Sequence, residues 1–422
     1  MTRMESFNAA PPALDKSQIS GAPEQWDRSG LPAWAYTNDE QLELERNVLF
    51  RRHWQLAGHV SNASEPGNYF CFDVAGERAI IVRGKDNEIR AFHNVCRHRG
   101  SRVVVNEVGT CGSALVCPFH GWSFNLDGTL RTVAQPKAVP TLDPVEHGLV
   151  PVEFEIWHGF VFVRFQPGPQ PAVADILARH EAEVALYRSA HAEPTRNSFW
   201  SQEIGANWKC VRDVDNEGYH VPMAHPGLQD LYGNNYFDEH WQGGTTRSFG
   251  PFKGETNRLW SVRAYNSVLP EVDYLPDSHR RAWLYIGMFP NQVLYFYPDG
   301  LGFYQEFPIA TDKTVLRGGA YGMPLSEAGD ATYNRHIRAA RYLSERIDND
   351  TAVEDIQLTV WSNEAAHSSG FQGFILSDLE YGVKQYHDQL RAVMPVLNQA
   401  EAPEHGALEP TNDKLLASLA PE

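Results

Sequence analysis

Two short segments of the chain each hold one cysteine and one histidine. They read Cys96-Arg-His98-Arg-Gly and Cys117-Pro-Phe-His120-Gly-Trp, with 18 residues between His98 and Cys117. Two thiolates can hold one iron ion while two neutral imidazoles hold a second, which is the ligation of a Rieske [2Fe-2S] cluster. Zinc is the alternative, but zinc motifs usually group cysteine with cysteine and histidine with histidine. The alternating order therefore favours the iron-sulfur cluster.

A second pair of histidines, His220 and His225, lies about a hundred residues further on. On an ideal helix their rings would point roughly 140° apart, so they can bind one metal only if the helix breaks between them. Pro222 disfavours helix at the residue before it, and Pro226 stops any continuation. Glu217 stands one turn before His220, where its carboxylate can hydrogen-bond that ring. The alternative is a helix end that carries two ordinary histidines.

The composition is that of an acidic, folded protein. With 422 residues, of which 42% are hydrophobic, two or three domains are expected. A formal net charge of −17 argues against binding to nucleic acid or to an anionic membrane surface. No apolar run approaches the roughly 18 residues of a membrane span, and the first residues lack the apolar core of a signal peptide. Five sparse cysteines indicate a reducing compartment, so we expect a cytoplasmic protein.

The element pattern changes once along the chain. A helix over 38–53, capped by Asn38 or Asp39, precedes a region of short strands that ends near residue 165. Asp127-Gly128 is a hairpin signal inside that region. The strands are expected at 69–72, 79–83, 89–93 and 160–165.

The second half mixes helices with longer strands. A helix is expected over 172–187, and a hairpin at Asp299-Gly300. Because the strands follow one another through short turns, their sheet should be antiparallel. Thr351 and Glu354 could form a capping box that starts a separate helix. The strands are expected at 283–289, 292–297, 302–307 and 314–321, the last two helices at 331–349 and 351–366, and irregular chain at 1–32 and after 398.

These motifs, taken in order, resemble the oxygenase (α) component of the Rieske non-haem iron oxygenases. The resemblance covers roughly residues 40–395. It rests on the two Cys/His segments, on Asn207-Trp-Lys, on Glu217-x-Tyr-His220-x-x-x-x-His225 and on Glu354-Asp355-Ile-Gln-Leu. It implies an α+β fold, with an all-β Rieske domain and a helix-grip (START-like) catalytic domain built on an antiparallel sheet.

The resemblance also implies how the chain is divided. An N-terminal arm is expected at 1–40 and the Rieske [2Fe-2S] domain, with its leading helix, at 41–168. The catalytic domain with the mononuclear iron is expected at 169–397, and a C-terminal tail at 398–422.

The resemblance implies that His220, His225 and Asp355 bind one Fe(II) ion, a two-histidine, one-carboxylate face that leaves positions open for O2. Spacing alone does not separate Asp355 from its acidic neighbours; its place in the motif does. Glu217 matches the carboxylate that joins an iron-ligand histidine to a cluster-ligand histidine of a neighbouring subunit. The implied chain is His120, Glu217 and His220 across the interface of a homotrimer.

Electrons would come from NAD(P)H through a separate flavin/iron-sulfur reductase, since the chain shows no dinucleotide-binding glycine-rich turn. One departure from the family pattern is Asp213-Val214, where Glu-Asn is common; Asn216 is present but displaced by two positions. We interpret Cys71, Cys111 and Cys210 as structural thiols. Trp122 would shield the cluster, and the role of Arg97 stays open.

Two substrate classes are compatible with these residues. Glu rather than Asp at position 217, with His225-Pro-Gly, resembles the branch that acts on carnitine, choline and betaines. The aromatic residues of the second half could form a cage for a quaternary ammonium group, or the wall of a pocket for an aromatic ring or acid. An electron-transfer Rieske protein is an alternative of another class. A Rieske ferredoxin would end near residue 165, and a respiratory Rieske subunit would have a membrane anchor and extra disulfide cysteines beside the ligands.

Overall fold

The computed structural model describes residues 22–254, 256–325 and 330–419. The first half of the expected N-terminal arm, residues 1–21, lies outside them. Residues just after it contact the C-terminal half, because Arg28 forms an ion pair with Asp378 and Ser29 pairs with Ile375. This part of the arm is therefore attached to the body of the protein.

A helical segment precedes the β-rich region, as predicted. The side chain of Asn38 accepts a hydrogen bond from the Gln41 N–H at 3.0 Å, so Asn38 rather than Asp39 is the cap. After α2 the chain continues in a wider helical turn over Arg46–Phe50. The segment comprises α1 (Trp34–Thr37) and α2 (Asp39–Glu45).

The β-rich region forms three small antiparallel sheets, with strand orders β4-β3-β2-β5, β6-β7-β8 and β1-β10-β9. The predicted strands and the Asp127-Gly128 hairpin are confirmed. Gly128 is required there, because its φ is +88° and a Cβ atom would lie 2.3 Å from the ring of Phe92. The strands are β1 (Gln55–His59), β2 (Asn68–Val74), β3 (Glu77–Arg83), β4 (Ile89–His93), β5 (Val108–Thr110), β6 (Leu115–Val116), β7 (Ser123–Phe124), β8 (Leu130–Thr132), β9 (Glu153–Trp157) and β10 (Phe160–Arg164).

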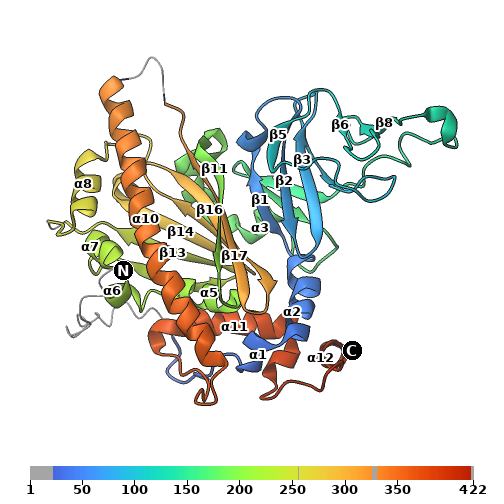
Figure 1. The fold of residues 1–422 in the computed structure, drawn as a ribbon. Coiled ribbons are helices and arrows are strands. Elements are labelled where there is room, and N and C mark those ends of the chain that lie inside the picture. The colour runs from blue at the N-terminus through green and yellow to red at the C-terminus, as the bar shows by residue number, and fades with distance from the viewer. Residues whose placement is uncertain (1–21, 255, 326–329, 420–422) are drawn as a thin grey trace.

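A seven-stranded antiparallel sheet forms the centre of the second half, with the order β11-β17-β16-β15-β14-β13-β12. One face packs against β1 and β10 through side chains such as Trp54, Phe160 and Leu284. Helices cover the opposite face, and Figure 1 shows the longest of them, α10, lying across the sheet. The strands are β11 (Glu193–Ile204), β12 (Phe237–Gln242), β13 (Thr245–Pro251), β14 (Ala282–Met288), β15 (Gln292–Phe296), β16 (Leu301–Ala310) and β17 (Lys313–Gly322).

The prediction of two helices over 331–366 is wrong, because a single helix, α10, runs from Ala331 to Ala366. Asp330 caps it by accepting a hydrogen bond from the Thr332 N–H. No glycine or proline interrupts this stretch, so the polar residues near Thr351 continue the helix rather than start a new one. The expected capping box of Thr351 with Glu354 is therefore absent.

Two further expectations are corrected. The helix predicted over 172–187 is a run of short turns, α3 (Val173–Ile176), a 3₁₀ turn, α4 (Glu181–Val184) and a second 3₁₀ turn. Glu155 and Trp157 of β9 hydrogen-bond the backbone of Val173 and the side chain of Glu181, so the segment follows the strand. The tail after 398 is not irregular, because it forms α12 (Leu408–Leu419), which buries Leu408.

The remaining helices connect the sheet to its surroundings. In the described part of the chain no helix is both long and apolar enough to span a membrane. The remaining α-helices are α5 (Trp208–Asp215), α6 (Val221–Ala224), α7 (Pro226–Tyr232), α8 (Trp260–Val268), α9 (Asp277–Arg280) and α11 (Tyr381–Val393).

Candidate metal centres

The two Cys/His segments fold into matching tight loops. In each loop the glycine four residues after the cysteine donates its N–H to the cysteine carbonyl, at 2.9 Å for Gly100 and 3.0 Å for Gly121. Both glycines have positive φ, +75° and +69°, a backbone conformation that residues with a Cβ atom rarely adopt. Glycine at these two positions therefore allows the loops after Cys96 and Cys117 to close with the same backbone hydrogen bond.

The four side chains meet between the loops as two pairs. The Cys96 thiol lies against the Cys117 thiol; burial raises the pKa of Cys96, and the neighbouring thiol raises it further. The rings of His98 and His120 lie 4.6 Å apart between centroids. The indole of Trp122 stacks on His98 at 4.9 Å with an interplanar angle of 5°.

This arrangement does not fit a single zinc ion. A lone tetrahedral ion draws three or four ligand atoms within about 4 Å of one another. Among the described residues, the three side chains whose ligand atoms converge as one group are His220, His225 and Asp355, and the Cys/His loops form no such group. A thiolate pair beside an imidazole pair matches a centre that holds two metal ions, one for each pair.

The second pair of histidines stands where α6 meets its neighbours. The chain leaves the helical conformation at His225, whose φ and ψ are −116° and 80°, directly before Pro226. The expected break at Val221 is wrong, because Pro222 lies in the first turn of α6, where a proline is tolerated. The break between the histidines exists, but one turn later than predicted, and it turns the two rings toward each other.

Three potential ligand atoms converge at this point. The Nε2 atoms of His220 and His225 lie 2.9 Å apart. Asp355 of α10 places Oδ1 2.9 Å from the His225 nitrogen and 3.5 Å from that of His220. Among the described residues, this is the one group of three or more His, Cys, Asp or Glu side chains whose ligand atoms lie within 4.8 Å of one another.

The far side of each imidazole contacts a carboxylate. Glu217 Oε1 lies 2.5 Å from His220 Nδ1, and Glu354 Oε2 lies 2.9 Å from His225 Nδ1. A carboxylate only accepts hydrogen bonds, so each Nδ1 carries a proton and each Nε2 is the ring nitrogen left to bind a metal ion. The Oδ1 of Asp355 is buried and accepts no well-directed hydrogen bond. Two imidazole nitrogens and one carboxylate oxygen that converge in this way fit a bound cation.

The charges around this point also favour a cation. Burial opposes protonation of His220, but the carboxylates of Asp355 and Glu217 outweigh it and raise the pKa of His220 to about 10. Burial opposes ionisation of Asp355, yet the two imidazoles beside it hold its pKa below the usual value. The same negative field would attract a divalent metal ion.

Helix α5 carries the residues that depart from the family pattern. Asp213 accepts hydrogen bonds from the Tyr36 hydroxyl at 2.7 Å and from His387 Nε2 at 2.8 Å, so it joins α5 to α1 and α11. Asn216 is buried and neither atom of its side-chain amide has a partner among the described residues. Sequence reasoning missed His387, and it treated Glu354 only as a rival of Asp355. The signal available in the sequence was that Glu354 and Asp355 are adjacent, so that one could face the metal while the other contacts a histidine.

Two family models match the chain. The model described as the Rieske [2Fe-2S] domain matches residues 53–143, and the model described as the ring hydroxylating alpha subunit (catalytic domain) matches residues 189–396. The first match contains Cys96 to His120, and the second contains His220, His225 and Asp355.

Curated relatives agree with these matches. The carnitine monooxygenase oxygenase subunit of Escherichia coli (strain K12) is 32% identical over 90% of this chain and 97% of its own length. The subunit of the same name from Acinetobacter pittii is 31% identical, but the chain spans 61% of it. The glycine betaine monooxygenase oxygenase subunit of Chromohalobacter salexigens is 36% identical over 48% of this chain and 44% of its own length.

Solved structures share the fold. A quaternary ammonium Rieske monooxygenase matches with a TM-score of 0.71 and 22% identity, covering 91% of this chain and 100% of the other. Naphthalene 1,2-dioxygenase from Rhodococcus sp., bound to indole, matches with a TM-score of 0.67 and 18% identity, covering 88% of this chain and 95% of the other.

Proposed function

The chain belongs to the Rieske non-haem iron oxygenases, and we propose that it is an oxygenase subunit that hydroxylates an N-methylated or quaternary amine. The observation that carries this proposal is the convergence of the imidazoles of His220 and His225 with the carboxylate of Asp355, which lies on α10. Three ligands on one side of a metal leave the other side open for O2 and substrate. Electrons would come from a separate NAD(P)H-dependent flavin/iron-sulfur reductase.

Each metal centre has its own set of residues in this proposal. Cys96 and Cys117 would hold one iron of the [2Fe-2S] cluster, and His98 and His120 the other. In the second centre, His220, His225 and Asp355 would hold the mononuclear Fe(II). When bound, the cluster supplies single electrons and the Fe(II) activates O2.

The carboxylates beside the second centre orient its ligands. Glu217 and Glu354 each hold a proton on Nδ1 of one histidine and so fix the ring that faces the metal. Burial of His225 and of the neighbouring Asp355 Oδ1 excludes water from two sides of the site. The hydrogen bonds from the two histidines to Glu217 and Glu354 keep the metal-facing nitrogens in place before substrate arrives.

We assign Glu217 the further role of linking His220 to the partner's His120 in a homotrimer. Figure 1 shows α6 and the small sheet of β6, β7 and β8 on opposite sides of one chain, which does not favour electron transfer within it. Phe119, next to His120, is exposed and available for contact with a neighbouring subunit. The solved quaternary ammonium enzyme is itself described in terms of inter-subunit electron transfer.

The substrate class is supported by the relatives and by the site. Curated relatives are named for carnitine, glycine betaine and choline, all quaternary ammonium compounds. Aromatic side chains lie on the helix-covered face of the large sheet beside Asp355's helix, and their faces attract cations. An aromatic ring or acid is the second candidate, since the same rings could line an apolar pocket.

Formaldehyde release decides between these candidates. The reconstituted enzyme, supplied with a reductase and NAD(P)H, should release formaldehyde or a cleaved amine from trimethylammonium compounds in an O2-dependent reaction. The Asp355→Ala variant is the matched inactive control. Hydroxylation of benzoates or arenes, with no turnover of any N-methyl compound, would replace the proposal with the second candidate.

Metal content separates the oxygenase from an electron carrier. We expect about three irons and two sulfides per chain, since a carrier with the cluster alone would hold two irons. We also propose a cytoplasmic location, which cell fractionation of the source organism tests.

A further inference from the structure

Asp348 is a second carboxylate on the metal-binding face of α10. It stands seven residues before Asp355, which on an α-helix is two turns, or about 10 Å along the axis, with nearly the same direction. Its side chain lies inside the catalytic domain, where burial raises its pKa to about 8, yet part of its surface remains accessible. The carboxyl group is therefore surrounded by protein without being fully covered.

The described residues around Asp348 do not form the ion pair or hydrogen-bond network that would give it a structural role. In the described part of the chain its one hydrogen-bond donor is the Tyr297 hydroxyl, at 3.1 Å. The charged groups that act on it are two other carboxylates, Asp299 and Glu345, and both disfavour its ionisation. A buried carboxylate without a cationic partner costs free energy, so its presence needs a reason.

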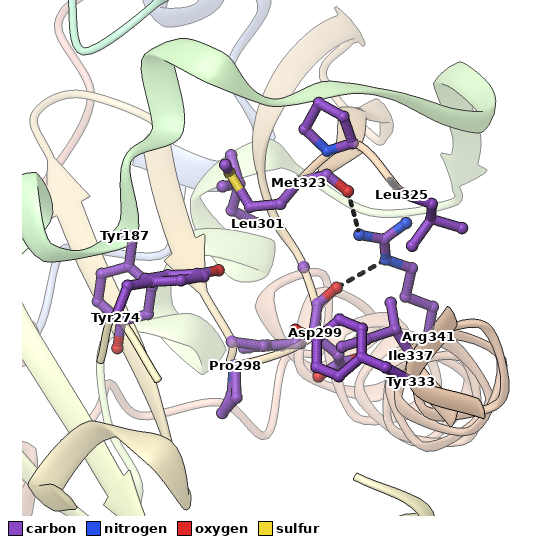
Figure 2. Close-up of a pocket in the computed structure, with 13 residues that line it drawn as sticks. Tyr187, Tyr274, Pro298, Asp299, Leu301, Met323, Leu325, Tyr333, Ile337 and Arg341 are labelled. Carbon is purple, nitrogen blue, oxygen red and sulfur yellow. Dashed lines mark hydrogen bonds between the residues drawn. The ribbon is translucent and has the colours of Figure 1, made fainter. Parts of the chain in front are cut away.

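Asp299, another buried aspartate nearby, does have such a structural role. Asp299 is also buried, but it accepts hydrogen bonds from the Tyr265 hydroxyl at 2.5 Å and from the Ser344 hydroxyl at 2.6 Å. Arg341, two turns before Asp348 on α10, is not its partner. Figure 2 shows that Arg341 donates to the backbone carbonyls of Asp299 and Met323, in a pocket beyond the β15–β16 turn.

Aromatic rings gather around Tyr297, whose hydroxyl contacts the carboxylate of Asp348. A chain of hydroxyls joins Tyr232 to Tyr285 at 3.3 Å and Tyr285 to Tyr297 at 3.0 Å, and so leads to Asp348. The rings of Trp283 and Tyr295 lie 4.0 and 5.0 Å from that of Tyr297. A carboxylate within a set of aromatic faces is a site for a cation that carries no hydrogen-bond donors.

Three tyrosines on this face of the sheet are, like Asp348, not fully covered. Tyr285, Tyr295 and Tyr304 lie on the helix-covered face of the sheet, deep in the protein, and each stays partly accessible. Gly302 lies opposite Tyr295 in the sheet, and a Cβ atom there would fall 2.4 Å from the Tyr295 hydroxyl. Glycine therefore lets this ring lie across β16 beside Asp348's helix.

We propose that Asp348 and the tyrosines around it bind the positively charged nitrogen of the substrate and place its N-methyl or adjoining carbon toward the metal-binding end of α10. This inference rests on the proposed function and names the residue that selects a cationic substrate. The incoming cation displaces the proton of Asp348, and the resulting carboxylate neutralises the positive charge. The rings exclude water, and the distance to Asp355 leaves room for one small substrate between them.

The test compares a cation with its neutral isostere. Binding of choline and of 3,3-dimethylbutan-1-ol, in which carbon replaces the nitrogen, is measured by calorimetry on the iron-loaded enzyme and on Asp348→Asn. Choline should bind the variant on the order of tenfold more weakly, while the neutral alcohol should bind both alike. Asp350→Asn, an exposed position on the same helix, is the matched control and should change neither.

Equal choline affinity of Asp348→Asn and the unsubstituted enzyme would overturn the inference. If Asp348→Asn does not accumulate as a folded protein, Tyr295→Leu carries the comparison, with the same selective loss expected and equal affinity as the contrary result. Failure of the proposed function looks different: the unsubstituted enzyme would then neither bind choline in preference to the alcohol nor turn over any N-methyl compound.

Discussion

At the scale of single residues, Glu354 and Asp355 are chemically alike and adjacent, yet the helix gives them different tasks. Asp355 points its Oδ1 at two imidazole nitrogens, whereas Glu354 contacts the opposite side of the His225 ring. Successive residues on a helix point about 100° apart, so one can face the metal position while the next reaches behind a ligand. Substitution of Asp355 and of Glu354 should therefore weaken iron binding to different extents.

Asp355→Ala should remove the mononuclear iron and leave the [2Fe-2S] cluster intact, because only the proposed second centre loses a ligand. Glu354→Gln should keep the site but weaken iron binding about 10- to 100-fold, as expected when a partner that orients a histidine ligand is lost. Iron and sulfide analysis after dialysis, with the visible spectrum of the cluster as the internal control, measures both. Full iron retention in Asp355→Ala would refute the ligand assignment.

Asp348 should make the protein less stable as pH rises. The unfolded chain releases the proton of this carboxyl near pH 3.8, while the folded protein holds it up to a pKa of about 8. Between these values the folded state binds more protons, so the free energy of unfolding falls with rising pH. Asp348→Asn removes this loss. Its apparent melting temperature should exceed that of the unsubstituted protein by more at pH 8 than at pH 4, and an equal difference at both would count against the burial argument.

At the scale of elements, α10 shows where sequence patterns work and where they fail. The strands of both halves were predictable because alternating apolar residues end at turn signals such as Asp127-Gly128 and Asp299-Gly300. The continuity of α10 was not predicted, because Thr351-x-x-Glu354 has the form of a capping box, although no glycine or proline before it ends the first helix. The partners of the histidines also depend on tertiary contacts, and no local pattern gives the approach of Glu354 to His225.

The continuity of α10 predicts opposite effects at two positions. Alanine at a true cap costs about 0.5–2 kcal/mol, whereas alanine within a helix is favourable. Asp330→Ala should therefore lower the apparent thermal midpoint, and Thr351→Ala should leave it unchanged or raise it slightly. Circular dichroism melts of both variants under one condition measure the difference. A clear loss for Thr351→Ala would mean that Thr351 starts a helix after all.

At the scale of the whole molecule, one buried ion pair joins the N-terminal helices to the helix that leads into the metal site. Lys209 of α5 and Glu45 of α2 lie 2.6 Å apart with no exposed side-chain surface, and Glu45 also accepts the indole N–H of Trp208 at 2.6 Å. Lys209→Met leaves a buried carboxylate without its cation and should cost about 3–5 kcal/mol. Adding Glu45→Leu should recover much of that loss. Urea unfolding of the single and double variants tests the coupling, which additive losses would exclude.

The two metal centres predict how whole chains must cooperate. We expect a mass in solution three times the 47.5 kDa of one chain. His120→Ala should disable the proposed cluster centre and Asp355→Ala the proposed mononuclear centre, so each variant alone should be inactive. Co-expressed with different tags and purified as mixed assemblies, they should regain activity, because an intact cluster in one subunit then adjoins an intact iron site in the next. Adding Glu217→Gln to the His120→Ala chain should abolish that recovery while both metals stay bound. If electrons moved within one chain, the mixed assemblies would be as inactive as their parents.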